Sequence, residues 1–156
     1  MNLFLSQYVN KIDKKGRVTL PSTFRSVLHN ENKKELILFK SLKFPAVEGC
    51  SYARINKIAE RIDKLDLFSE DQDDFTTSIF SEIVPTHMDK EGRFLIPDFL
   101  KEYSNINNEA TFIGQGHYFQ IWEPSAVLVH QRESRERLVS QKKTLGSIII
   151  NKSHEK

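Results

Sequence analysis

The pentapeptide Asp13-Lys14-Lys15-Gly16-Arg17 recurs later in the chain as Asp89-Lys90-Glu91-Gly92-Arg93. Each copy runs into an apolar alternation that ends at a proline, Pro21 in the first copy and Pro97 in the second. Residues 13–28 and 89–104 align without a gap and share Asp, Lys, Gly, Arg and Pro. A small unit that occurs twice and cannot close its own core predicts a single fold built from two copies.

Each copy begins with the pattern of a tight turn. Asp13 and Asp89 stand at the first position, where the side chain can accept a backbone N–H two residues further on. Gly16 and Gly92 stand at the fourth position, where glycine tolerates the positive φ that ends the turn. These four residues are therefore the candidate turn-forming residues.

The residues after each turn alternate as in a strand. Val18 and Leu20 lie on one face and Arg17 on the other, and 93–96 repeats the pattern. Proline then ends the strand, because it lacks an N–H for the ladder. Ser22 and Asp98 are favourable N-cap residues, so we expect each to cap a short helix.

Hydrophobic periodicity predicts the remaining elements. We expect a helix that is capped by Ser51 and has an apolar face through Leu65, and a second helix over Asp71–Val84 that ends at Pro85. A last helix is expected after Pro124-Ser125, followed by a loose tail from Gly146. The expected further strands are Leu3–Ile12, Leu36–Phe39, Phe44–Cys50, Thr86–Met88, Thr111–Ile113 and Tyr118–Trp122.

Composition favours a soluble globular protein of 156 residues, with 38% hydrophobic residues and a net charge of +2. No apolar run approaches the roughly 20 residues of a membrane span, and the start lacks the basic leader of a secretion signal. The lone Cys50 cannot form an internal disulfide. Charge is uneven: the charged side chains of residues 1–30 are mostly basic, whereas those of residues 60–74 are mostly acidic. Such a chain can present its basic face to a polyanion.

The repeated Asp-x-x-Gly-Arg turn, alternating strand, proline and short helix resemble the SpoVT–AbrB family of DNA-binding modules. Two modules in one chain are similar to the MraZ family of bacterial transcriptional regulators, through Phe4–Pro21, His87–Pro97 and Gly114–Glu123; the resemblance covers about residues 1–145. It implies an α+β fold, a pseudo-dimeric AbrB-like swapped-hairpin β-barrel from two internal repeats with flanking helices. The expected domains are 7–54 and 83–126 as the two modules, and 127–156 as a C-terminal helix with a flexible tail.

The resemblance also implies function. We expect a ring-like homo-oligomer that binds double-stranded DNA at direct repeats in the promoter of its own division and cell-wall gene cluster, in the cytoplasm with the nucleoid. Arg17 and Arg93 are the candidate base readers, because a planar guanidinium can bind guanine bidentately. Glu91 makes the second loop less basic than the first. The candidate phosphate contacts are Lys11, Lys14, Lys15 and Lys90.

Two alternative functions belong to other classes of protein, an enzyme and a protein-binding module. An enzyme is disfavoured, because the five His residues are scattered and no nucleophile elbow or phosphate-binding loop is present, so we expect no cofactor and no metal. A protein-binding module, antitoxin-like or a scaffold, is the stronger alternative. The predicted helix near Ser125–Lys143 and the tail after it could serve that purpose.

Overall fold

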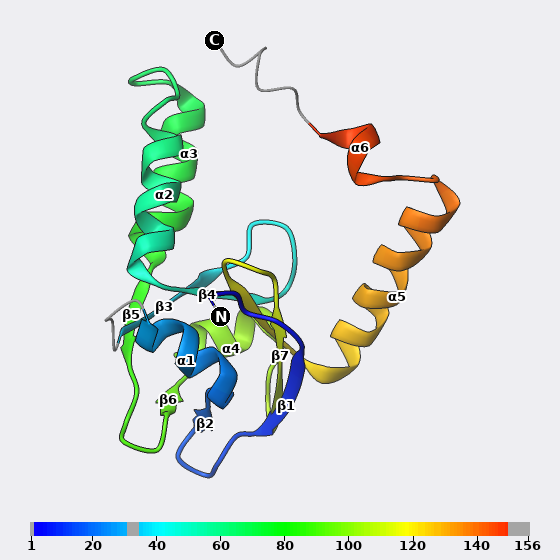
Figure 1. The fold of residues 1–156 in the computed structure, drawn as a ribbon. Coiled ribbons are helices and arrows are strands. Elements are labelled where there is room, and N and C mark those ends of the chain that lie inside the picture. The colour runs from blue at the N-terminus through cyan, green and yellow to red at the C-terminus, as the bar shows by residue number, and fades with distance from the viewer. Residues whose placement is uncertain (1, 31–34, 150–156) are drawn as a thin grey trace. The chain divides into compact units, whose positions relative to one another are not determined.

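The computed structural model describes residues 2–30 and 35–149, and Figure 1 shows its elements. The chain divides into two compact units, Met1–Pro124 and Ser125–Lys156. Among the described residues, no helix combines the length and the apolar character needed to cross a lipid bilayer. The expected tail from Gly146 lies only partly within the described residues, where its first residues belong to a short helix.

Strands of the first unit are β1 (Gln7–Lys11), β2 (Arg17–Thr19), β3 (Glu35–Lys40), β4 (Val47–Cys50), β5 (Val84–His87), β6 (Arg93–Leu95), β7 (Glu109–Gly114) and β8 (Phe119–Trp122). Its helices are α1 (Ser22–Asn30), α2 (Tyr52–Ile62), α3 (Glu70–Ile79), the 3-10 helix η1 (Phe80–Glu82) and α4 (Asp98–Ser104). Helix α5 (Pro124–Ser140) begins at the end of this unit, and α6 (Leu145–Ile148) follows in the second unit.

The sheet order shows how the two repeats combine. Six strands form one antiparallel sheet in the order β1-β7-β8-β4-β3-β5, and β2 and β6 form a separate pair. The first strand of each repeat pairs with the third strand of the other, β1 with β7 and β5 with β3. Neither repeat therefore completes the sheet without the other, and the expectation of an α+β fold from two repeats is confirmed.

The β2–β6 pair is a short ribbon made of one strand from each repeat. Val18 lies opposite Phe94 in its register, and both side chains are buried. Arg17 lies opposite Leu95, and Thr19 opposite Arg93. Side chains of directly opposed residues share a face. One face of the ribbon therefore enters the core and the other carries both arginines.

The main core draws aromatic side chains from both repeats. Phe24 from α1 packs edge-on against Phe4 and Phe112, and it also contacts Phe119. All four rings are almost completely buried. Because the rings of one repeat need those of the other, the two copies form a single hydrophobic core.

A second, smaller core lies between the sheet and the α2–α3 segment. Ile37 and Cys50 from the strands pack there with Ile62 and Ile79. The predicted apolar face of α2 through Leu65 packs against this cluster. The Ser51 side chain accepts a hydrogen bond from the Arg54 backbone N–H, so the predicted N-cap is confirmed.

Two expectations about helix ends are wrong. Pro97, not Asp98, is the N-cap of α4, so Asp98 lies inside the first turn; Ser22 likewise lies within α1. The proline ring fixes φ of Pro97 at −55°, and its ψ of 144° lies outside the helical range, so the helix begins at the next residue. The helix predicted to reach Val84 ends at Ile79, and Pro85 lies within β5 at the edge of the sheet, where its missing N–H is tolerated.

Candidate nucleic-acid interface

The first loop, residues 11–17 between β1 and β2, is held together by the Asp13 carboxylate. Its Oδ1 accepts hydrogen bonds from the backbone N–H of Lys15 at 2.9 Å and of Arg17 at 2.8 Å. Gly16, with φ of 84°, donates its backbone N–H to the Asp13 carbonyl at 2.9 Å. The loop is thus closed by one side chain together with a left-handed glycine.

The second loop, residues 87–93 between β5 and β6, repeats this geometry. Asp89 Oδ1 accepts from the backbone N–H of Glu91 at 3.0 Å and of Arg93 at 2.9 Å. Gly92 has φ of 79° and donates to the Asp89 carbonyl at 3.0 Å. Two loops of matching shape therefore flank the β2–β6 ribbon.

Each loop aspartate also orients the arginine that ends its loop. Arg17 Nε donates to Asp13 Oδ2 at 2.8 Å, and Arg93 Nε donates to Asp89 Oδ2 at the same distance. The two arginine side chains remain 30% and 33% exposed. Because the carboxylate engages Nε, the outer edge of the guanidinium, with its two terminal nitrogens, is turned away from it.

The two guanidinium groups differ at that outer edge. Arg93 Nη2 lies 3.4 Å from Glu91 Oε2. Among the described residues, no hydrogen bond or ion pair reaches the terminal nitrogens of Arg17. The Arg17 guanidinium is therefore fixed through Nε while its terminal nitrogens have no partner among the described residues. The charge of Arg93 is partly neutralised by Glu91.

Both loop aspartates have perturbed acidities. The backbone N–H and the guanidinium of Arg17 hold the pKa of Asp13 below 3.8, and Arg93 acts likewise on Asp89. The pKa of Arg93 is raised, first by its hydrogen bond to Asp89, and Asp13 of the other loop contributes to the rise. The loops are thus close enough for their charges to interact, as the ribbon register requires.

The candidate lysines lie around this face. Lys14, Lys15 and Lys90 are exposed within the loops, and Lys11 is exposed at the end of β1. The acidic segment of residues 60–74 belongs to the α2–α3 hairpin and is not part of either loop. The structure therefore brings all six sequence-predicted basic residues to the two loops or to the strand that enters one of them.

Arg25 is a basic residue at this site that the repeat pattern did not single out. Its guanidinium donates from Nη1 to the Leu20 carbonyl, and a Cβ at Gly92 would lie 2.5 Å from Arg25 Cδ. The Arg25 side chain, which belongs to α1 of the first repeat, therefore packs against Gly92 in the loop of the second repeat. The equivalent position in the second repeat is Lys101, so comparing the repeats position by position would have marked both as basic.

None of this geometry resembles a catalytic centre that depends on a metal. Within residues 2–30 and 35–149, no group of three or more His, Cys, Asp or Glu side chains is arranged to hold a metal ion. The chemistry that the two loops offer is the presentation of fixed guanidinium groups, with ammonium groups beside them.

Comparison with known proteins gives a consistent result. The model of a family described as "MraZ protein, putative antitoxin-like" matches residues 79–144. Curated proteins that bear the name "Transcriptional regulator MraZ" match most of the chain. The protein from Rickettsia akari is 37% identical over 145 residues, which cover 93% of this chain and 97% of the relative.

Two further relatives carry the same name. The protein from Pelagibacter ubique is 46% identical over 124 residues, 80% of each chain. The protein from Rickettsia typhi is 42% identical over 124 residues, covering 80% of this chain and 83% of the relative. At this identity and coverage, the similarity extends through both repeats.

Proposed function

The chain belongs to the MraZ family and is a transcriptional regulator, and we propose that it acts by binding direct repeats in DNA specifically. The proposed target is the promoter of its own division and cell-wall gene cluster. The protein would act in the cytoplasm, on the nucleoid. The observation that carries this proposal is the shared outward face of the β2–β6 ribbon, on which Arg17 and Arg93 are each fixed by an aspartate.

The shape of that face supports a role in the major groove. The major groove of B-DNA accommodates a two-stranded β-ribbon, and its guanine edges accept bidentate hydrogen bonds from arginine. Arg17 is already oriented through Nε, so less side-chain freedom would be lost when its terminal nitrogens meet a base. We therefore assign base reading to Arg17 first and to Arg93 second.

The lysines suit a different task. Lys14 and Lys15 are exposed at the tip of the first loop and Lys90 is exposed in the second. Ammonium groups at such positions neutralise phosphates, which sets the register on the duplex but carries no sequence information. Each phosphate contact should add about 0.9 to the slope of log affinity against log salt.

We further propose that the protein assembles into a ring-like homo-oligomer, with residues 7–54 and 83–126 as its DNA-binding modules. Large apolar side chains are exposed in both units, including Phe68 at 93% and Val139 at 70%. Exposed apolar groups of this size favour association between subunits. Native mass spectrometry at micromolar concentration tests this proposal, and a population of monomer alone would contradict it.

A gel-shift series tests the DNA-binding proposal. The probes are the DNA upstream of the protein's own gene and the same DNA with its repeats scrambled. Arg17→Ala should remove the preference for intact repeats, a loss of roughly 1–3 kcal/mol of discrimination. Lys14→Ala should weaken binding to both probes about equally.

Lys57→Ala is the matched control, because Lys57 is exposed on α2 and away from both loops. It should leave both probes unaffected. If Arg17→Ala still separates intact from scrambled repeats, Arg17 does not read bases. If the wild-type protein binds neither probe, the DNA-binding proposal itself fails.

A further inference from the structure

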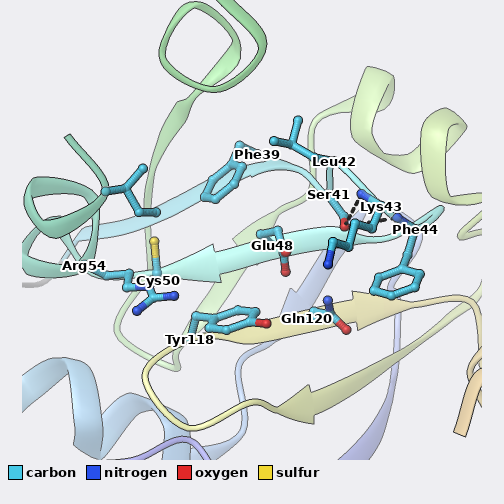
Figure 2. Close-up of a pocket in the computed structure, with 11 residues that line it drawn as sticks. Phe39, Ser41, Leu42, Lys43, Phe44, Glu48, Cys50, Arg54, Tyr118 and Gln120 are labelled. Carbon is cyan, nitrogen blue, oxygen red and sulfur yellow. Dashed lines mark hydrogen bonds between the residues drawn. The ribbon is translucent and has the colours of Figure 1, made fainter. Parts of the chain in front are cut away.

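A cavity of about 320 Å³ lies beside the centre of the six-stranded sheet, away from the two arginine loops. Figure 2 shows it between β4, the β3–β4 loop, the start of α2 and the segment that leads into β8. Binding pockets for small molecules span roughly 300–1,000 Å³. The cavity is therefore large enough for one small ligand, and all of its lining residues belong to the first unit.

Glu48 is the polar centre of this cavity. Its side chain projects from β4 into the middle of the space (Figure 2). Its Oε2 is shielded from bulk solvent and has no hydrogen-bond partner within residues 2–30 and 35–149. A buried carboxylate oxygen without a donor costs free energy. The fold retains an acceptor here that a bound N–H group would satisfy.

The neighbouring amide is fixed by the protein. Gln120 Oε1 accepts a hydrogen bond from the indole Nε1 of Trp122 at 2.9 Å and another from Gln115 Nε2 at 3.4 Å. Its NH₂ group is therefore directed to the Glu48 carboxylate, where it stabilises the charged form. The Ser41 side chain also acts on this carboxylate by hydrogen bonding, and Oε2 remains the oxygen without a donor among the described residues.

The walls favour a flat molecule. Phe39, Phe44 and Tyr118 supply aromatic rings, and the Arg54 guanidinium lies 5.1 Å from the centre of the Tyr118 ring. Lys43 adds a second cation to the lining. Two cations beside one carboxylate disfavour a positively charged ligand and favour a neutral ring with an anionic substituent.

From this arrangement we propose that the cavity binds a planar heterocycle of the guanine type, with its N–H donors on Glu48 and its ring against the aromatic walls. A phosphate on such a ligand would meet either Lys43 or Arg54, which line the cavity on opposite sides of Glu48 (Figure 2). The assignment is independent of the DNA-binding proposal, because none of the residues it uses lies in the loops of residues 11–17 and 87–93.

The single tryptophan of the chain allows a direct test. Trp122 bonds to Gln120 and its ring centre lies 5.7 Å from that of Phe44, so a ligand in the cavity should change its fluorescence. The protein is titrated with GMP, with guanosine and with AMP. We expect a saturable change with GMP in the micromolar range. AMP lacks the N1–H donor and should bind at least about tenfold more weakly.

Glu48→Gln removes the carboxylate but keeps the shape of the side chain, and it should weaken GMP binding at least about tenfold. Glu60→Gln, exposed on α2, is the matched control and should bind as the wild type does. Weaker binding of guanosine than of GMP would support a contact between the phosphate and Lys43 or Arg54, and equal binding would contradict that contact. No saturable response to GMP at millimolar concentration, equal binding of AMP, or full binding by a folded Glu48→Gln variant would each overturn the proposal.

Discussion

At the scale of single residues, Glu91 is the clearest difference between the two loops. It stands where the first loop has Lys15, and its carboxylate lies 3.4 Å from Arg93 Nη2. An acidic group at a DNA-facing loop repels phosphate and competes for the guanidinium. Glu91→Lys should therefore tighten DNA binding and steepen its salt dependence by about one unit for a newly contacted phosphate.

Fluorescence anisotropy over a range of salt concentrations measures both effects. Glu60→Lys makes the same charge change on α2, so it controls for net charge alone and should alter the salt slope much less. Equal effects of the two substitutions would mean that Glu91 acts only through the total charge of the protein.

The acidity of Glu48 is a second property of a single residue. Burial raises its pKa from 4.5 to about 7, against the opposing effects of Gln120, Arg54 and Ser41. The folded state therefore holds this proton more tightly than the unfolded chain does. The free energy of unfolding should fall as pH rises through the interval from 4.5 to about 7, by an amount on the order of 3 kcal/mol.

Urea unfolding at several pH values tests this expectation. The groups that face Glu48 are Arg54 from α2, Gln120 and Tyr118 from the β8 side, and Ser41 and Lys43 from the β3–β4 loop. Glu48→Gln should be more stable than the wild type at pH 8 and close to it at pH 4. A pH dependence that persists unchanged in the variant would assign the effect to other carboxyl groups.

At the scale of elements, helix α1 and the β5–β6 loop form a contact between the two repeats. Arg25 covers Gly92, and Leu20 donates its backbone N–H to the Gly92 carbonyl at 2.9 Å. The corresponding Gly16 has a looser environment, since a Cβ there would lie 3.6 Å from Leu95 Cδ2. Two glycines with similar positive φ values thus have different neighbours.

Alanine substitutions at these glycines separate backbone strain from packing. Both Gly16→Ala and Gly92→Ala should lose about 1–2 kcal/mol through the positive φ. Gly92→Ala should lose roughly 1–2 kcal/mol more, because Arg25 must leave the Leu20 carbonyl. Chemical denaturation measures the difference. When Gly16→Ala and Gly92→Ala are each combined with Arg25→Ala, the difference in stability between them should disappear. A difference that survives would point to another cause.

The elements also show what a sequence can reveal. The repeat was sufficient to predict the turns and the alternation of Val18 and Phe94, and hydrophobic periodicity was sufficient to predict the cap at Ser51, because each depends on a few neighbouring residues. The end of α3 was not, because Pro85 is compatible with an edge strand as well as a helix end, and tertiary pairing with β3 decides between them. The Glu48 cavity draws on four separate segments, so no local pattern marks it.

At the scale of the whole molecule, each chain offers one ribbon face with two fixed arginines. A contact this small gives weak binding, and an assembly in which several subunits engage successive repeats gains affinity through effective concentration. DNA with three repeats should bind roughly 10²–10⁴-fold more tightly than DNA with one. The comparison needs only the wild-type protein, with anisotropy at fixed salt as the measurement.

The spacing of the repeats provides the control for that experiment. Sites about 10–10.5 base pairs apart face the same side of the duplex. Inserting about half a turn, roughly 5 base pairs, between repeats places neighbouring sites on opposite faces. A rigid assembly should then lose most of the gain, while subunits that bind independently should lose none of it. Equal affinity for one and for three repeats would show that the ribbon faces act one at a time, whatever the oligomeric state.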